Sequence, residues 1–182
     1  YDAGVIAARL LTDRLSPTSD ILMARIVHSG KNDSNQGKNR RDGFCYYLKK
    51  VGFSGKLHEV ELKISDSVYN FAKLNEIFEL NPGIKGAIIF NSTCYILGNY
   101  LKTRGMQAVK LVGYDLIERN TQLLSEGVIT ALIAQRPERQ GYEGIKSLCN
   151  YLLFKQKTEK VNLMPIDILL RENLKYYLNN KL

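Results

Sequence analysis

The sequence alternates between short runs rich in aliphatic and β-branched residues and longer runs with helical periodicity. The continuous apolar runs ILMARIVHS (21–29) and GAIIFN (86–91) predict strands that are buried on both faces. Between such runs, apolar residues recur at helical spacing over ten or more positions. Strands and helices that alternate through short connections predict a parallel sheet with helices on both faces. We therefore expect an α/β fold.

The boundaries of the elements follow from periodicity and from capping residues. Expected strands cover 21–29, 57–64, 86–91, 109–115, 129–135 and roughly 162–170. Expected helices cover 37–51, 92–104 and 137–154, and a further helix follows Ser65 or Asp66 as its cap. Ser92 or Thr93 is the expected cap of the 92–104 helix, and Pro137 lies in the first turn of the 137–154 helix. A short helical tail ends the chain. Apolar stripes on three of these helices hold Phe44, Tyr47, Leu48 and Val51, then Val68, Phe71, Leu74 and Phe78, and last Tyr142, Ile145, Leu148, Cys149, Leu152 and Leu153.

Composition excludes several classes of protein. No apolar run approaches the length of a membrane span, and the apolar share of 45% is that of a globular chain. Three widely spaced cysteines do not form a disulfide framework or a metal-binding pattern, and His28 and His58 stand far apart. We therefore expect reduced thiols, no metal, no membrane association and a cytoplasmic location.

The net charge of +8 raises the question of a nucleic-acid surface. The positive charges are dispersed, and the densest cluster, KNRR (38–41), is followed at once by Asp42. No helix-turn-helix, zinc finger or RNA-binding motif is present. This pattern favours a solvated surface over a DNA-contacting face.

Polar residues follow the predicted strands at positions where a parallel sheet binds ligands. Asn91, Asp115 and Gln135 stand at three strand ends, and Arg40 stands near the start of the helix after the first strand. Such groups donate and accept several hydrogen bonds, which suits a neutral polyhydroxylated ligand, and Tyr114 offers an aromatic face nearby. The alternative is that Asn91 and Asp115 are ordinary helix caps.

Catalytic motifs are absent. The sequence holds no GxSxG, no GxxxxGK[ST], no HExxH and no acidic partner for Asp115 at a strand end. We therefore expect a binding protein without a cofactor, and not an enzyme.

Four collinear motifs resemble the type I periplasmic-binding-protein fold. RRDGF (40–44) resembles its R-x-x-G-F signature, and KLVGYD (110–115) resembles its V-V-G-[FY]-D strand. The segment ITALIAQRP (129–137), followed by QG (140–141), is similar to its T-x-x-Q-x-P-x-x-x-G segment. The stretch 81–91 resembles the N-P turn and the strand that ends at a ligand-binding residue. The likeness covers nearly the whole chain, in order and at the family's spacing.

This resemblance implies a fold of two Rossmann-like αβα lobes with a ligand between them. It implies that residues 1–135 form the second lobe, that residues 136–182 belong to the first lobe and the final crossover, and that most of the first lobe lies outside this chain. In sugar-binding members, the positions that match Arg40, Asn91, Asp115 and Gln135 commonly bind the sugar. Ser92 departs from the pattern, because many relatives carry Asp there.

The same fold serves lac-repressor-type (LacI/GalR) transcription regulators and periplasmic sugar receptors. Three unpaired cysteines suit a reducing cytoplasm and therefore favour the regulator. Its effector would be a sugar. Its contact with DNA would be made only by an N-terminal helix-turn-helix that these residues do not include. The alternative is a periplasmic sugar-binding receptor for transport or chemotaxis. Because the stripe on the 137–154 helix packs on the first lobe in relatives, we expect the 137–182 segment either to fold back on its own lobe or to pack against another copy, giving a homodimer.

Overall fold

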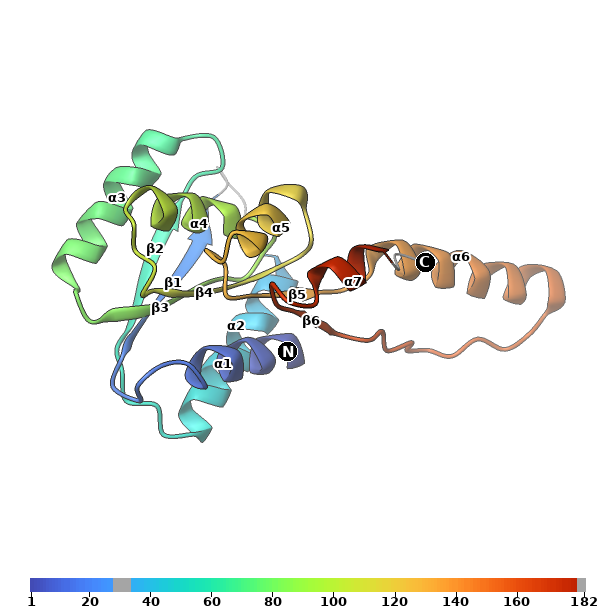
Figure 1. Ribbon diagram of the computed structural model, residues 1–182. Coiled ribbons are helices and arrows are strands. Elements are labelled where there is room, and N and C mark those ends of the chain that lie inside the picture. The colour runs from blue at the N-terminus through green and yellow to red at the C-terminus, as the bar shows by residue number, and fades with distance from the viewer. Residues whose placement is uncertain (28–33, 180–182) are drawn as a thin grey trace.

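The computed structural model describes residues 1–27 and 34–179. A six-stranded sheet in the order β2-β1-β3-β4-β5-β6 forms the centre of the molecule (Figure 1). The five parallel strands are β1 (Asp20–Ile26), β2 (Leu57–Leu62), β3 (Ile84–Ile89), β4 (Lys110–Tyr114) and β5 (Ala131–Ala134). At the edge, β6 (Asp167–Leu169) runs antiparallel to β5.

Helices cover both faces of the sheet, as the alternating pattern predicts. On one face lie α1 (Asp2–Thr12) and α2 (Asn35–Lys50), and on the other lie α3 (Ser67–Leu80), α4 (Cys94–Thr103) and α5 (Glu118–Ser125) (Figure 1). Each face has its own hydrophobic cluster, and the strand pleat divides residues between them. In β3, Ile88 packs on the α1–α2 side, whereas Ala87 and Ile89 pack on the opposite side. The predicted α/β class with a mostly parallel sheet is confirmed.

The direction of winding reverses beside β1. The chain passes from β1 outward to β2, then returns across β1 to β3 and continues to β4 and β5. The carboxyl ends of β1 and β3 therefore flank a topological switch point, where ligands bind in open α/β sheets.

Two glycines let α1 and α2 cross closely. A Cβ atom on Gly4 would lie 1.8 Å from the main-chain oxygen of Arg40, and one on Gly43 would lie 2.2 Å from that of Tyr1. Because α2 carries Arg40, this backbone contact sets the depth at which Arg40 enters the molecule.

Most of the expected boundaries hold to within a few residues. The helix after β2 is capped by Asp66, whose Oδ1 accepts a hydrogen bond from the Tyr69 amide at 2.9 Å. The strand expected over 21–29 ends at Ile26, and 28–29 lie outside the described residues. The stripe assignments for Val51 and Val68 are wrong: these side chains are 49% and 80% exposed, since one follows α2 and the other lies in the first turn of α3.

The last strand differs from its prediction in length and direction. The expected span was 162–170, but only Asp167–Leu169 pair with the sheet, and they pair antiparallel. The reason is that α6 (Pro137–Phe154) leads the chain away from the sheet, so the returning segment approaches β5 from the opposite direction (Figure 1). A short helix, α7 (Leu174–Asn179), follows as expected.

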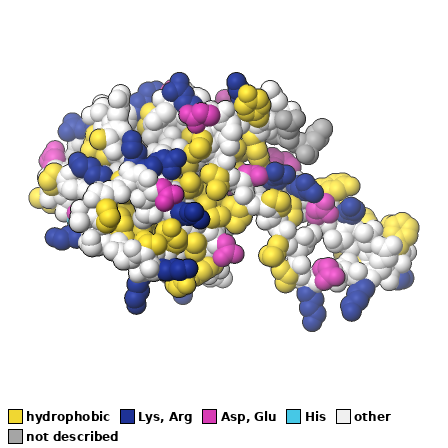
Figure 2. Space-filling view, turned by 60° about the horizontal axis from the view of Figure 1, so that its bottom comes forward, with side chains coloured by type: hydrophobic (Ala, Val, Ile, Leu, Met, Phe, Trp, Pro, Cys, Tyr) yellow, Lys and Arg dark blue, Asp and Glu magenta, His cyan; other side chains and the backbone are white. Residues whose placement is uncertain are grey.

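Helix α6 and the irregular segment that returns from it form an arm, residues 137–166, that projects from the body (Figure 1). No described residue of α6 is buried. The fold-back alternative is therefore wrong for this helix, although β6 and α7 of the same segment do return to the lobe, and contact with a second copy stays a prediction. Exposed hydrophobic side chains lie along the arm, which stands apart from the body in Figure 2: Tyr142, Ile145, Leu148, Tyr151, Leu152, Leu153, Phe154, Val161 and Leu163.

Candidate functional site

The fold brings the four predicted site residues to the carboxyl edge of the sheet. Asn91 follows β3, Asp115 follows β4 and Gln135 follows β5. Arg40 reaches the same edge from α2, where its Nη1 donates a hydrogen bond of 2.8 Å to the main-chain oxygen of Phe90, beside Asn91. This contact lies at the switch point between β1 and β3.

Arg40 is the most deeply buried charged side chain of this set, with only 3% exposed. Its guanidinium carbon lies 4.0 Å from the centroid of the Tyr114 ring, a cation–π arrangement. Burial lowers the pKa of Arg40, and the neighbouring Asp115 opposes that shift. Within the described structure, Nη2 is buried and has no hydrogen-bond partner. The site therefore contains a charged side chain with one donor nitrogen, Nη2, that no described group of the protein accepts from.

The sequence suggested that Tyr114 offers an aromatic face to the ligand. In the structure the ring supports Arg40 instead and does not face the cavity. The side chain is fully buried, and its hydroxyl donates a hydrogen bond of 3.1 Å to the main-chain oxygen of Ala3 in α1. Burial raises the pKa of Tyr114, so the hydroxyl stays a donor. The ring is thus part of the floor under the guanidinium.

Asp115 adopts the left-handed backbone conformation, with φ of 65°. It is not the cap of the following helix, because α5 begins after Ile117. Burial raises the pKa of the Asp115 carboxyl, and the positive charge of Arg40 opposes that rise. The capping alternative therefore fails for Asp115, which is left as a half-buried acceptor beside a cation.

The side-chain oxygen of Asn91 is hydrogen-bonded within its own turn. Its Oδ1 accepts hydrogen bonds from the amide of Thr93 at 2.9 Å and from the hydroxyl of Thr93 at 2.6 Å. Thr93 occupies the N-cap position of α4, which is one of the two positions expected, but its side chain makes no cap bond. The capping alternative therefore fails for Asn91, whose oxygen is bonded within its own turn instead.

Gln135 joins the starts of two helices. Its Oε1 accepts a hydrogen bond of 3.1 Å from Nε2 of Gln36 in α2, and its main-chain oxygen accepts one of 2.5 Å from Gln140 in α6. Gln135 therefore lies where the arm leaves the sheet.

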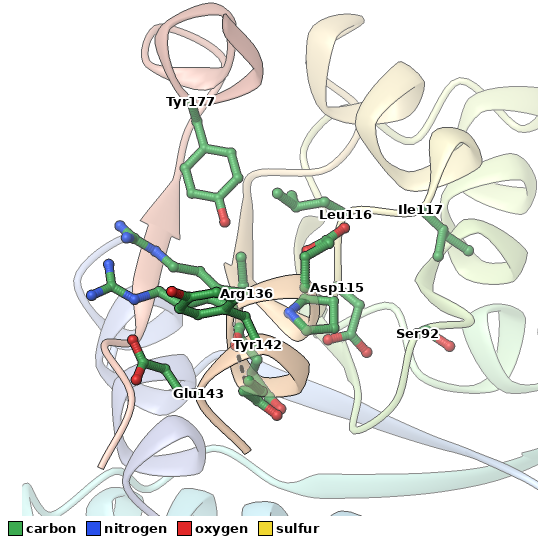
Figure 3. Close-up of a pocket in the computed structure, with 14 residues that line it drawn as sticks. Ser92, Asp115, Leu116, Ile117, Arg136, Tyr142, Glu143 and Tyr177 are labelled. Atoms are coloured by element: carbon green, nitrogen blue, oxygen red, sulfur yellow. Dashed lines mark hydrogen bonds between the residues drawn. The ribbon is translucent and has the colours of Figure 1, made fainter. Parts of the chain in front are cut away.

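An open cavity of about 910 Å³ lies between the carboxyl edge and the first turns of α6. Figure 3 shows Ser92, Asp115, Leu116 and Ile117 on one side, with Arg136, Tyr142, Glu143 and Tyr177 on the other. Asp115 and Gln135 line this cavity, whereas Arg40 and Asn91 do not. The structure thus separates the predicted set into two residues at the cavity and two that are more deeply placed or locally bonded.

Two features of the site escaped sequence reasoning. Arg136 has φ of 48° and holds Asp167 through Nε at 2.5 Å and Nη2 at 2.8 Å, which ties β5 to β6 where the arm begins. Asn120 is a fully buried polar residue in α5. Its position at i, with Leu123 and Leu124 at i+3 and i+4, is the one signal that places it on the inner face of the helix.

No gathering of three His, Cys, Asp or Glu side chains that could hold a metal ion occurs among the described residues. Cys45, Cys94 and Cys149 are free thiols. Within residues 1–27 and 34–179, no helix combines the length and apolar character that a bilayer span requires.

The fold and the site define a doubly wound α/β domain with a polar cavity at the carboxyl ends of its strands. Residues 1–156 match the family described as the periplasmic binding protein domain, and the chain belongs to that family. No match is found among curated proteins.

Solved structures show the same fold. A candidate LacI transcriptional regulator from Bacteroides fragilis is 38% identical with a TM-score of 0.90, over 97% of this chain and 61% of that one. A solute-binding protein of an ABC transporter from Agrobacterium vitis, bound with α-D-tagatopyranose, is 20% identical with a TM-score of 0.78, over 94% and 56% of the two chains. A periplasmic solute-binding protein from Actinobacillus succinogenes with bound D-allose is 17% identical with a TM-score of 0.77, over 97% and 60%. The chain thus spans about three fifths of the length of these proteins.

Proposed function

We propose that this chain is the effector-binding region of a LacI-type transcription regulator and that it binds a sugar or a related small polyhydroxylated molecule. The site would recognise hydroxyl groups through Arg40, Asn91, Asp115 and Gln135. No catalytic step is assigned to it, because the proposed roles are those of hydrogen-bond donors and acceptors.

The observation that carries the proposal is the unpaired Nη2 of Arg40 beside the raised-pKa carboxyl of Asp115. A buried charged donor without a partner is unfavourable by at least about 1–3 kcal/mol, so a bound acceptor would remove that penalty. A sugar hydroxyl both donates and accepts, so it would pair with Asp115 at the cavity wall, and it would reach Nη2 of Arg40 as that wall adjusts around the ligand. The two bound sugars named among the similar structures agree with this chemistry.

The remaining two residues take secondary roles in this proposal. Asn91 uses Oδ1 in its own turn, so its contribution to a ligand would be a donated hydrogen bond from Nδ2. Gln135 lines the cavity and is held by Gln36, which would fix the direction of its amide.

We further propose that residues 1–135 form one lobe, that the arm belongs to the other, and that β6 and α7 are the final crossover, which returns to the lobe of residues 1–135. The absence of any buried described residue in α6 and the greater length of the similar proteins support this division. On this proposal the 182-residue chain supplies one wall of the cleft. Since each net hydrogen bond contributes about 0.5–1.5 kcal/mol, a few such bonds give millimolar or weaker binding.

The regulator is preferred to the receptor for two reasons. The similar protein with the higher identity is described as a candidate LacI regulator, and three free thiols suit a reducing cytoplasm. In such a regulator, DNA binding belongs to a separate helix-turn-helix, and the effector domain forms a homodimer. The alternative, a periplasmic sugar receptor for transport or chemotaxis, is favoured by the sugar-transport proteins among the similar structures.

Weak binding to one wall is measured directly by NMR. We would titrate the chain with D-tagatose, D-arabinose, D-allose and D-glucose up to their solubility limits and follow the Arg40 side-chain NH and Asp115 signals. A saturable shift with one D-sugar, absent with its L-enantiomer and in Arg40→Ala, supports the proposal. Shifts that are equal for both enantiomers contradict it, and so does a full-length protein that binds none of the sugars.

An experiment on the full-length protein distinguishes the regulator function from the receptor function. Sequence-selective DNA binding that changes with the sugar, measured by fluorescence anisotropy at physiological salt, supports the regulator. Sugar binding without any DNA preference supports the receptor. The 182-residue chain itself should bind DNA only non-specifically, with an affinity that falls steeply with salt.

A further inference from the structure

Asn120 is fully buried near the start of α5 and uses its whole side chain in hydrogen bonds. Its Nδ2 lies 2.9 Å from the main-chain oxygen of Ser92, 3.0 Å from that of Tyr114 and 3.1 Å from that of Asp115. Its Oδ1 accepts a hydrogen bond of 2.9 Å from the amide of Tyr95. One side chain thus joins the turn after β3, the turn after β4 and the first turn of α4.

These contacts fix the backbone on both sides of Asp115. A φ of 65° is unfavourable for residues with a Cβ atom, so neighbouring contacts must hold it. The main-chain oxygen of Asp115 accepts from Asn120, and its amide donates to the oxygen of Ile133 in β5 at 3.0 Å. The carboxyl of Asp115 therefore projects from a clamped residue into the cavity.

The same side chain completes the start of α4. The first amides of a helix have no partner within the helix, and Thr93 in the N-cap position makes no side-chain cap bond. Asn120 supplies an acceptor to the Tyr95 amide from a different helix. Because Ser92 lies directly before Thr93, this contact also fixes the wall of the cavity that Ser92 lines.

An amide side chain is required at this position. Three main-chain oxygens share the two N–H donors of Nδ2, and one main-chain amide donates to Oδ1; only the amide of Asn or Gln provides two N–H donors together with an acceptor oxygen. A carboxylate could not donate, a hydroxyl has a single donor, and an aliphatic side chain would remove all four hydrogen bonds.

We propose that Asn120 is a positioning residue of the sugar site: it holds Ser92 and Asp115 in register with each other and fixes the direction of the Asp115 carboxyl. Asn120 itself does not contact the ligand. This inference rests on the proposed function for its role in binding, but the geometric part is measurable without any sugar.

The chain offers a matched control. Asn70 is also a buried Asn that bridges main-chain groups, because Oδ1 accepts from the Lys63 amide at 2.8 Å and Nδ2 donates to the Lys63 oxygen at 2.6 Å. It lies in α3 and bonds to the turn after β2, outside the cavity. Asn120→Ser and Asn70→Ser therefore remove the same type of contact from two different turns.

The first readout is the titration of the Asp115 carboxyl, followed by its side-chain carbon resonance without sugar. We expect the pKa of Asp115, raised by burial in the wild type, to fall toward its ordinary value in Asn120→Ser as the turn opens to water, and to stay unchanged in Asn70→Ser. The second readout is affinity for D-tagatose, D-arabinose and D-allose. Asn120→Ser should lose at least tenfold for any of these that the wild type binds.

A folded Asn120→Ser protein with the wild-type pKa of Asp115 would overturn the inference. If the pKa falls but no probe binds the wild type, the positioning role stands and the proposed sugar function fails. If Asn120→Ser does not fold, hydrogen exchange of the wild type decides. Slow exchange of the Asn120 side-chain amide and of the Tyr95 amide supports the clamp, and exchange as fast as that of an exposed Asn contradicts it.

Discussion

The guanidinium of Arg40 lies on the ring of Tyr114, and the hydroxyl of Tyr114 in turn donates to the main-chain oxygen of Ala3. A charged group at the ligand edge is thus supported by a column of contacts that passes through β4 to α1. Since Arg40 also donates to the Phe90 oxygen, its position is set by three separate elements.

Substitution of Arg40 tests the binding role of this column. Arg40→Ala should weaken sugar binding of the full-length protein at least tenfold, about 1.4 kcal/mol, because the fork of donors is lost. The control is Arg41→Ala, since Arg41 is exposed and pairs with Glu59 on the surface. Calorimetry that gives the same affinity for Arg40→Ala and wild type would show that the site assignment is wrong.

Substitution of Gly4 tests the helix crossing beneath Arg40. Gly4→Ala would place a Cβ atom 1.8 Å from the Arg40 main-chain oxygen, so α1 and α2 must separate. We expect the free energy of unfolding to fall by about 1–3 kcal/mol, as in other overpacked sites, despite the better helix propensity of Ala. Gly37→Ala in α2 meets its nearest atom, Ser34 Oγ, at 3.4 Å and should be close to neutral. Urea denaturation compares the two, and equal stability for both variants would contradict the crossing.

The pH dependence of the free energy of unfolding should depend on Asp20, which lies at the start of β1, at the amino ends of the strands. Its Oδ2 lies 2.8 Å from His58 Nε2 and its Oδ1 accepts from the Lys56 amide at 2.9 Å. The hydrogen bond with His58, and then that with Lys56, lowers the pKa of Asp20. A carboxyl with a lowered pKa stabilises the fold above its ordinary pKa, and that contribution is lost as the pH falls through the folded value.

Asp20→Asn should therefore lower the free energy of unfolding by at least about 1 kcal/mol at neutral pH and should reduce the loss of stability below about pH 4. Chemical denaturation at a series of pH values measures both effects. The exposed Asp13→Asn is the control and should follow the wild type. A wild-type pH profile in Asp20→Asn would exclude this pair as an acid-sensitive element.

The arm should make the isolated chain associate. Burial of one Leu-sized side chain stabilises by about 1.5–3 kcal/mol, and the arm exposes several such side chains. Light scattering at tens of micromolar should report a dimer or a larger species. The double substitution Leu148→Glu and Leu152→Glu should shift it to monomer, whereas Lys146→Glu on the same helix should not. A monomeric wild type would contradict association through the arm.

Local features of the sequence account for the succession of elements. Periodicity, capping residues and proline act over a few residues, so α6 begins at Pro137 and ends at Phe154 as predicted, and the five parallel strands lie within or close to their expected ranges. The edge that carries the polar residues was also predictable, because parallel strands present their carboxyl ends together.

The partners of these residues are set by packing between separate elements. The burial of Tyr114 depends on α1, more than a hundred residues away, and the clamp on Asp115 depends on an Asn from the next helix. The antiparallel direction of β6 depends on where the arm turns back. Contacts of this kind arise when separate elements pack against one another, and the local pattern of the chain that produces each element does not encode which polar groups will then meet.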